Sequence, residues 1–164
     1  MNIFPLGGII TLLVLLPNLL AVFFPPVHVK GEPKITQLKA IKVLTIFERI
    51  GQAGCFMTPF FYALTVHSNA QAAAAIIMAG ALGIYYWGWA RYLVLGRSEH
   101  LFYRSILGIP VPMAVMPVLY FLLASLLLGS VWLLMASILL GIGHLSISWI
   151  NGSMLEGIQK RKEK

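Results

Sequence analysis

Apolar runs long enough to cross a bilayer constrain this chain more than any other feature. Of its 164 residues, 59% are hydrophobic and only 10% are charged, whereas soluble domains carry about 25% charged residues. A helix needs about 20 apolar residues to span a bilayer. The sequence therefore predicts an all-α, polytopic integral membrane protein with a single domain, 1–164. The five transmembrane helices are expected at about 3–24, 41–64, 72–95, 111–128 and 131–150.

Basic residues predict how these spans are oriented, because they gather at alternate span ends. Eleven of them do so: Lys30, Lys34, Lys39 and Lys42 after the first span, Arg91, Arg97 and Arg104 around the third loop, and Lys160, Arg161, Lys162 and Lys164 in the tail. Cytoplasmic loops of membrane proteins are enriched in Lys and Arg. We therefore expect a multi-pass protein of the cell membrane with its N-terminus outside and its C-terminus in the cytoplasm. The net charge of +7 indicates attraction to anionic lipid of the bilayer, and no nucleic-acid partner is expected.

The second span carries ionisable and amide side chains inside an apolar segment: Glu48, Arg49 and Gln52. Such groups face the protein interior or a wet cavity, where they form pairs or functional sites. Glu48 and Arg49 point about 100° apart on a helix and cannot pair well with each other. We expect Glu48 to pair with His144 or Arg91, and Arg49 with backbone carbonyls, lipid phosphate or a second carboxylate. A structural ion pair is the leading interpretation, and a proton or substrate site is the alternative.

Two strips of small or polar residues predict contacts between helices. Gly51, Gly54 and Thr58 form a small-residue strip on the second span, which lets another helix approach closely. The fifth span carries polar and small residues at intervals of three and four, so they share one face. These are Ser137, Gly141, His144, Ser148 and Asn151. We expect this stripe to face other helices and not lipid.

Aromatic residues crowd the end of the third span. Tyr85, Trp89 and Tyr92 share one helix face, and Trp87 and Arg91 share another. Aromatic residues at a span end are typical of an interfacial anchor. The alternative is an aromatic wall around a ligand, with Arg91 binding its carboxylate or phosphate.

The segment before the fourth span contains Pro110 and Pro112, which cannot both lie within a regular helix. One interpretation is an interfacial helix at 98–107, then a break and the span. The other is a helix that simply starts with prolines in its first turn.

Polar residues concentrate in the expected cytoplasmic half, which favours a wet site opening inward. The candidate site residues are Glu48, Arg49, Gln52, Tyr85, Trp89, Arg91, Tyr92, His144, Ser148 and Asn151. We expect them to bind or transport a small anionic or amphiphilic molecule. The alternatives are an accessory subunit that contacts a second copy or a partner membrane protein, and a lipid-modifying enzyme using His144 and Glu48. The chain has no aspartate, no H-E-x-x-H and no C-x-x-C, so no metal or cofactor is expected.

Overall fold

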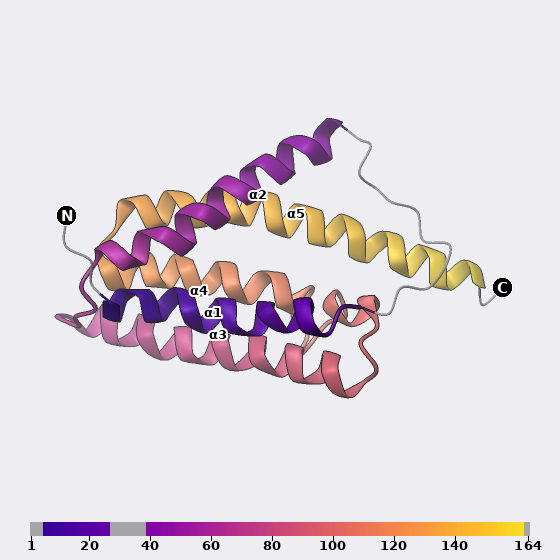
Figure 1. The fold of residues 1–164 in the computed structure, drawn as a ribbon, viewed down its shortest axis with the longest axis horizontal. Coiled ribbons are helices and arrows are strands. Elements are labelled where there is room, and N and C mark those ends of the chain that lie inside the picture. The colour runs from indigo at the N-terminus through magenta and orange to yellow at the C-terminus, as the bar shows by residue number, and fades with distance from the viewer. Residues whose placement is uncertain (1–4, 27–38, 163–164) are drawn as a thin grey trace.

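Five α-helices and two short 3-10 helices form the described part of a computed structural model, which covers residues 5–26 and 39–162 (Figure 1). The elements are α1 (Pro5–Phe23), α2 (Lys39–Met57), η1 (Thr58–Phe61), α3 (Asn69–Val94), η2 (Glu99–Phe102), α4 (Pro112–Leu128) and α5 (Val131–Lys162). That part of the chain contains no strand, although Ile106 and Ile109 form an isolated bridge. The predicted all-α fold is confirmed.

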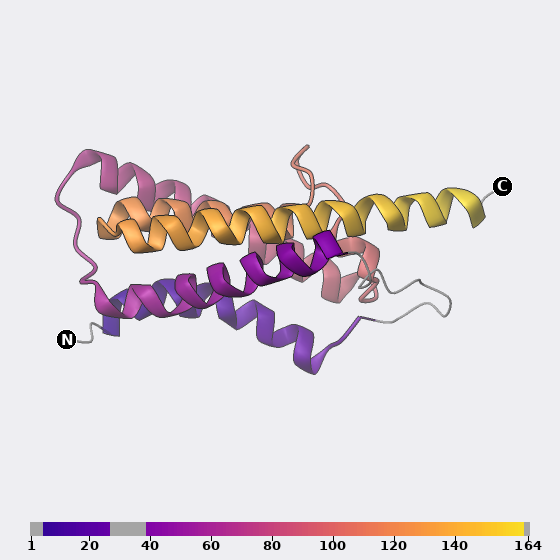
Figure 2. The same ribbon diagram turned by 90° about the horizontal axis from the view of Figure 1, so that it is seen from above.

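The helices run lengthwise beside one another. α2 packs most extensively on α5, α3 on α4, and α4 on α5, whereas α1 contacts mainly η1. α1 begins at the end of the bundle where α2 leads into α3, and α5 ends at the opposite end (Figure 1). Figure 2 shows that the last part of α5 extends beyond the other helices.

Three helices in the described residues are long and apolar enough to cross a membrane. Their apolar segments are residues 6–23, 69–94 and 131–157. α4 is apolar but has only 17 residues, and α2 contains Lys39, Lys42, Glu48 and Arg49. Composition and length therefore support a membrane location.

The expected bounds of α3 and α5 need correction. α3 starts at Asn69 because Ser68 caps it, with the Ser68 hydroxyl accepting a hydrogen bond from the Gln71 N–H at 3.2 Å. α5 continues to Lys162, well beyond the expected end at residue 150. Its last turns are too polar to be detected as a membrane span by hydropathy. They form a helix because they contain residues of high helix propensity, such as Met, Leu, Glu, Gln, Lys and Arg.

The expected interfacial helix at 98–107 is wrong in extent, since only η2 is helical there. Ile106 and Ile109 then exchange two backbone hydrogen bonds, of 3.3 and 2.9 Å. The two residues between them have positive φ, 53° at Leu107 and 78° at Gly108, as in a type I′ turn. α4 begins directly at Pro112, so a proline in the first turn is the correct interpretation of the helix start.

α2 ends at Met57, although the span was expected to reach residue 64, because Pro59 follows. Proline lacks an N–H and leaves the carbonyl four residues earlier without its helical donor. Here that carbonyl belongs to Cys55. The Thr11 hydroxyl of α1 donates to the Phe56 carbonyl at 3.1 Å and lies 3.5 Å from the Cys55 carbonyl. A side chain of α1 thus replaces bonding that Pro59 removes.

A hydrogen bond between α1 and α3 also forms at a carbonyl that a proline leaves free. Pro17 lies inside α1 and leaves the Leu13 carbonyl without its helical donor. The Tyr86 hydroxyl of α3 donates to that carbonyl at 2.8 Å. These hydroxyl contacts compensate for the limited packing of α1 on the other helices.

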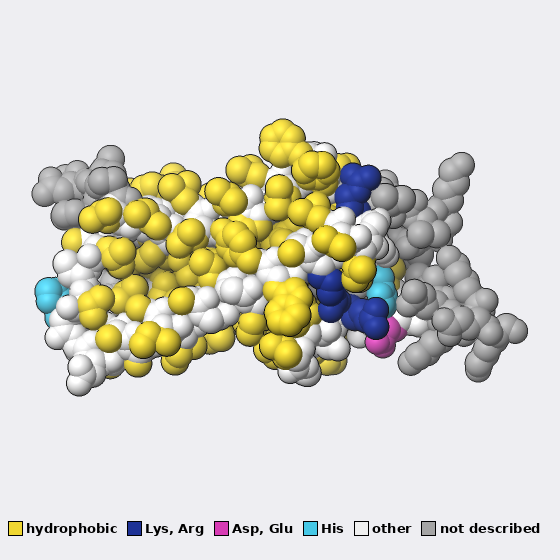
Figure 3. All heavy atoms as spheres, turned by 90° about the horizontal axis from the view of Figure 1, so that it is seen from below, with side chains coloured by type: hydrophobic (Ala, Val, Ile, Leu, Met, Phe, Trp, Pro, Cys, Tyr) yellow, Lys and Arg dark blue, Asp and Glu magenta, His cyan; other side chains and the backbone are white. Residues whose placement is uncertain are grey.

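Charged side chains gather at one end of the molecule. On the face in Figure 3, Lys and Arg lie toward the end where α3 and α5 finish, and hydrophobic side chains cover the middle. Lys30, Lys34 and Lys164, which contribute to the expected charge pattern, lie outside the described residues.

Candidate functional site

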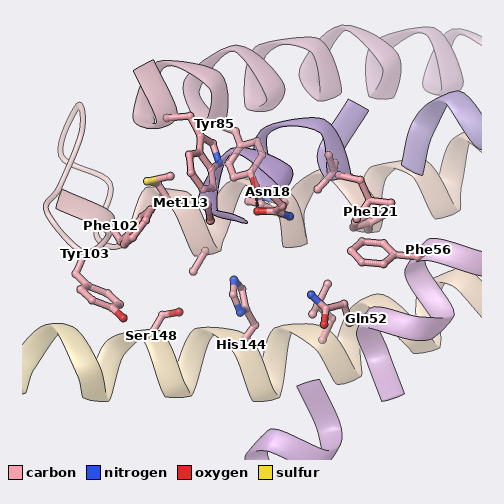
Figure 4. Close-up of a pocket in the computed structure, with 17 residues that line it drawn as sticks. Asn18, Gln52, Phe56, Tyr85, Phe102, Tyr103, Met113, Phe121, His144 and Ser148 are labelled. Carbon is pink, nitrogen blue, oxygen red and sulfur yellow. Dashed lines mark hydrogen bonds between the residues drawn. The ribbon is translucent and has the colours of Figure 1, made fainter. Parts of the chain in front are cut away.

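A cavity of about 360 Å³ lies among the five α-helices (Figure 4). Each helix contributes to its lining, for example Asn18 from α1, Gln52 from α2, Tyr85 from α3, Phe121 from α4 and His144 from α5. Most of the other lining side chains are apolar or aromatic. Ligand cavities typically have such a lining, with a few polar groups that orient the ligand.

One wall of the cavity carries polar side chains of α5 and α2. Figure 4 shows His144 and Ser148 of α5 pointing into the same space, with Gln52 nearby and the aromatic residues across from them. His144 and Ser148 are one turn apart and belong to the predicted polar stripe of α5. The stripe therefore faces other helices, as expected.

Glu48 and His144 form the strongest polar contact of this wall. The Glu48 Oε1 atom lies 2.6 Å from His144 Nδ1. The predicted pairing of Glu48 with His144, one of its two expected partners, is confirmed. An ionised Glu48 can only accept, so Nδ1 then carries the hydrogen and Nε2 is the ring nitrogen left for a ligand. Glu48 does not line the cavity itself.

Three further residues with polar groups, Asn18, Tyr85 and Trp89, line the opposite wall. The Tyr85 hydroxyl donates to Asn18 Oδ1 at 2.7 Å, which joins α3 to α1 beside the cavity. Trp89 also lines the cavity, and its buried indole Nε1–H has no acceptor among the described residues. That nitrogen has almost no accessible surface, so it is not exposed to a ligand in the cavity.

An imidazole oriented by a carboxylate can accept and return a proton. Ser148 lies on the same face as His144, but no hydrogen bond joins the two side chains in the described part of the chain.

No protein-family model, curated protein or solved structure matches this chain. The chemistry of the lining residues is therefore the basis for assigning a function.

Two arginines of the predicted site lie outside the cavity. Arg91 donates from Nη1 to the Ser105 carbonyl and from Nη2 to the Arg104 carbonyl, each at 3.2 Å. It fixes the chain after η2 and is not available as the expected ligand clamp. The Arg49 side chain is exposed on α2, and it has no hydrogen bond or ion pair within the described residues.

The aromatic face of α3 is not an interfacial anchor. Tyr85, Trp89 and Tyr92 are 3%, 5% and 0% exposed, which contradicts the anchor interpretation for these three. Tyr92 donates to the Phe24 carbonyl at 2.8 Å and stacks on Phe102 with ring centroids 4.4 Å apart. Tyr85 and Trp89 belong to the cavity wall, whereas Tyr92 supports it from behind.

Asn151, the last residue of the predicted site, lies near the end of the cavity. Its Nδ2 donates to the Tyr103 hydroxyl at 3.4 Å, and Tyr103 lines the cavity. Asn151 therefore positions a lining residue without lining the cavity itself.

Several lining residues were not predicted as site residues. Asn18 had a usable signal, since it is the one strongly polar side chain of its span and must face other helices in lipid. Phe102, Met113 and Phe121 had none, because an apolar side chain in an apolar helix gives no indication of which way it faces.

Proposed function

We propose that this chain is a multi-pass membrane protein whose central cavity binds a small amphiphilic molecule. One observation carries the proposal: all five α-helices line a single cavity of about 360 Å³. This volume lies within the range of about 300–1,000 Å³ for small-molecule sites. A mostly apolar lining with a few polar groups suits a molecule that has an apolar body and a polar head.

The proposed topology has five spans, with the N-terminus outside and the C-terminus in the cytoplasm. The basic side chains at one end support this orientation. α4 has 17 residues, which is at the short end of the range of about 17–25 for a spanning helix. α2 tolerates Glu48 in lipid because the carboxylate is paired with His144.

The lining favours an amphiphile with an uncharged head over an anion. Among residues 5–26 and 39–162, no Lys, Arg, Asp or Glu lines the cavity, and Arg91 is bound to backbone carbonyls. The Gln52 side-chain amide can donate to a carbonyl or hydroxyl oxygen of the head. In the transport version of this proposal, the protein carries the bound molecule across the membrane.

The test measures the thermal unfolding of the purified protein in detergent with added amphiphiles. Suitable probes are a monoacylglycerol, an isoprenoid quinone and a fatty acid, used at equal concentrations. An uncharged probe at 100 times its Kd should add about 2.7 kcal/mol to the free energy of unfolding. Stabilisation by the fatty acid alone would contradict the uncharged head.

Variants that fill the cavity provide the specificity control. Ala21→Leu and Ser148→Leu place extra volume in the lining and should abolish the stabilisation by the probe. Ala90→Leu adds the same kind of side chain at an exposed position of α3 outside the lining, so it should respond as the wild type does. Equal responses of all three variants would contradict the cavity as the binding site.

A second candidate function, an accessory subunit, is favoured by Arg49. Its side chain is exposed on an apolar helix and has no partner in the described residues. A guanidinium in this position is matched by lipid phosphate at the interface or by a carboxylate of another chain. A protein that none of the probes stabilises would favour this candidate over the ligand-binding one.

A further inference from the structure

A second cavity, also of about 360 Å³, lies at the charged end of the molecule. Its walls come from the connection between η2 and α4 and from the last third of α5. It shares only Tyr103 with the central cavity. The two cavities therefore present different chemistry.

The second cavity is lined by side chains of both charges. Arg104 and Glu156 both contribute to it and both are exposed. No ion pair joins them, and neither side chain has another partner within the described residues. His100, Ser105 and Ser153 add further polar groups. One occupant of this cavity would meet a free guanidinium and a free carboxylate at the same time.

Trp149 places the cavity at the edge of the apolar part of the protein. Its side chain lines the cavity and is 58% exposed, and the sequence of α5 becomes charged after it, with Glu156, Lys160, Arg161 and Lys162. Tryptophan is enriched at the level of the lipid headgroups, where its ring meets both apolar and polar surroundings. The cavity is therefore at the depth of the headgroups when the chain lies in a bilayer.

We propose that the second cavity binds the headgroup of a zwitterionic phospholipid that carries a primary ammonium. The phosphate lies at Arg104, whose planar guanidinium can donate two parallel hydrogen bonds to phosphate oxygens. The ammonium lies at Glu156. An anionic headgroup would satisfy Arg104 but leave Glu156 facing a like charge. This inference rests on the membrane insertion proposed above and does not depend on what occupies the central cavity.

The test compares two phospholipids with identical acyl chains, phosphatidylethanolamine and phosphatidylglycerol. Binding of each lipid to the detergent-solubilised protein is measured by native mass spectrometry and by the shift in unfolding temperature. Wild type should prefer phosphatidylethanolamine. Glu156→Gln should weaken its binding about tenfold, the effect of losing one charge-assisted hydrogen bond, and should shift the preference toward phosphatidylglycerol. Arg104→Gln should weaken the binding of both lipids.

Lys42→Gln is the matched control, because it removes a positive charge from an exposed side chain outside the cavity. It should bind both lipids as wild type does. The same loss in Lys42→Gln as in Arg104→Gln, or an unchanged lipid preference in Glu156→Gln, would overturn the proposal. Both cavity positions are exposed, so the unfolding temperature without lipid should be unchanged, which verifies that the variants fold.

Two soluble probes identify the source of the headgroup. Phosphoethanolamine has the same charges as the lipid headgroup without the acyl chains, and inorganic phosphate has only the anion. The proposal expects both to bind far more weakly than the lipid, since they bury no chain beside Trp149. Equal binding of phosphoethanolamine and the lipid would overturn the assignment to a membrane lipid.

Discussion

At the scale of single residues, Glu48 and His144 explain how a carboxylate is accommodated in an apolar segment. Their side chains are 19% and 30% exposed and meet at 2.6 Å. The contact joins α2 to α5 at the cavity wall and fixes which imidazole nitrogen faces the cavity. Arg49, the adjacent residue, has no such role, because it points away from this contact.

Replacing Glu48 should separate its hydrogen-bonding role from its charge. Glu48→Ala leaves His144 Nδ1 without its partner and should lower the free energy of unfolding by about 1–3 kcal/mol. Glu48→Gln keeps an acceptor of the same shape and should lose less. Thermal unfolding in detergent measures both effects.

Arg49→Gln is the control for the Glu48 variants, since it changes the charge of the adjacent, exposed side chain. Its unfolding temperature in the isolated protein should match that of the wild type. If Glu48→Ala unfolded at the wild-type temperature, the contact with His144 would contribute nothing to stability.

At the scale of elements, the crossing of α2 and α5 depends on glycines. A Cβ atom built at Gly143 would lie 2.5 Å from the Leu44 carbonyl oxygen and the Glu48 nitrogen, and one at Gly51 would lie 2.2 Å from the Leu140 nitrogen. Backbone atoms cannot move aside as a flexible side chain can. The small-residue strip predicted on the second span therefore does bring another helix close, and it brings Glu48 within reach of His144.

Adding one methyl group at the crossing should push the helices apart. Gly143→Ala should destabilise the protein by about 1–3 kcal/mol, the usual cost of overpacking. Gly80→Ala makes the same change in α3, where a Cβ meets nothing within 4 Å. Alanine is about 1 kcal/mol more favourable than glycine inside a helix, so this control should be neutral or stabilising. Equal losses in the two variants, measured by thermal unfolding, would contradict the close crossing.

At the scale of the whole molecule, the face in Figure 3 carries its Lys and Arg side chains toward one end and hydrophobic side chains over the middle. Such a distribution suits a bundle that lies across a bilayer with its basic end in the cytoplasm. The proposed phospholipid site depends on this placement, because the placement puts the second cavity at the depth of the headgroups.

Cysteine labelling on intact cells should report the orientation. Cys55, which is fully buried, is first replaced by alanine. A cysteine at His67, in the exposed connection between η1 and α3, should react with an impermeant maleimide from outside. A cysteine at Ser98, exposed at the basic end, should react only after the membrane is opened. The reverse pattern would invert the orientation.

The sequence by itself determined the helices and several of their contacts. Apolar runs of about 20 residues can satisfy their backbone in lipid only as helices or closed barrels, and each of the five expected segments contains an α-helix. Isolated polar groups in such segments must face other helices. The contact between Glu48 and His144 was therefore predictable, and so was the orientation of the polar stripe of α5 toward the other helices. The end of α5 at Lys162 was not predictable in this way. Hydropathy identifies only the part of a helix that lies in lipid, whereas a polar segment beyond the membrane surface can still be helical.

Only the tertiary structure decided which side chains surround the cavity. The sequence of an amphipathic helix shows which face is buried. α3 and α4 are apolar nearly all round, so no hydrophobic periodicity in their sequences predicts how they are rotated about their axes. The packing of close-fitting surfaces sets it instead. That rotation places Phe121 and Met113 in the lining, turns Arg91 toward the Ser105 carbonyl, and brings the Tyr86 hydroxyl to the carbonyl that Pro17 leaves free.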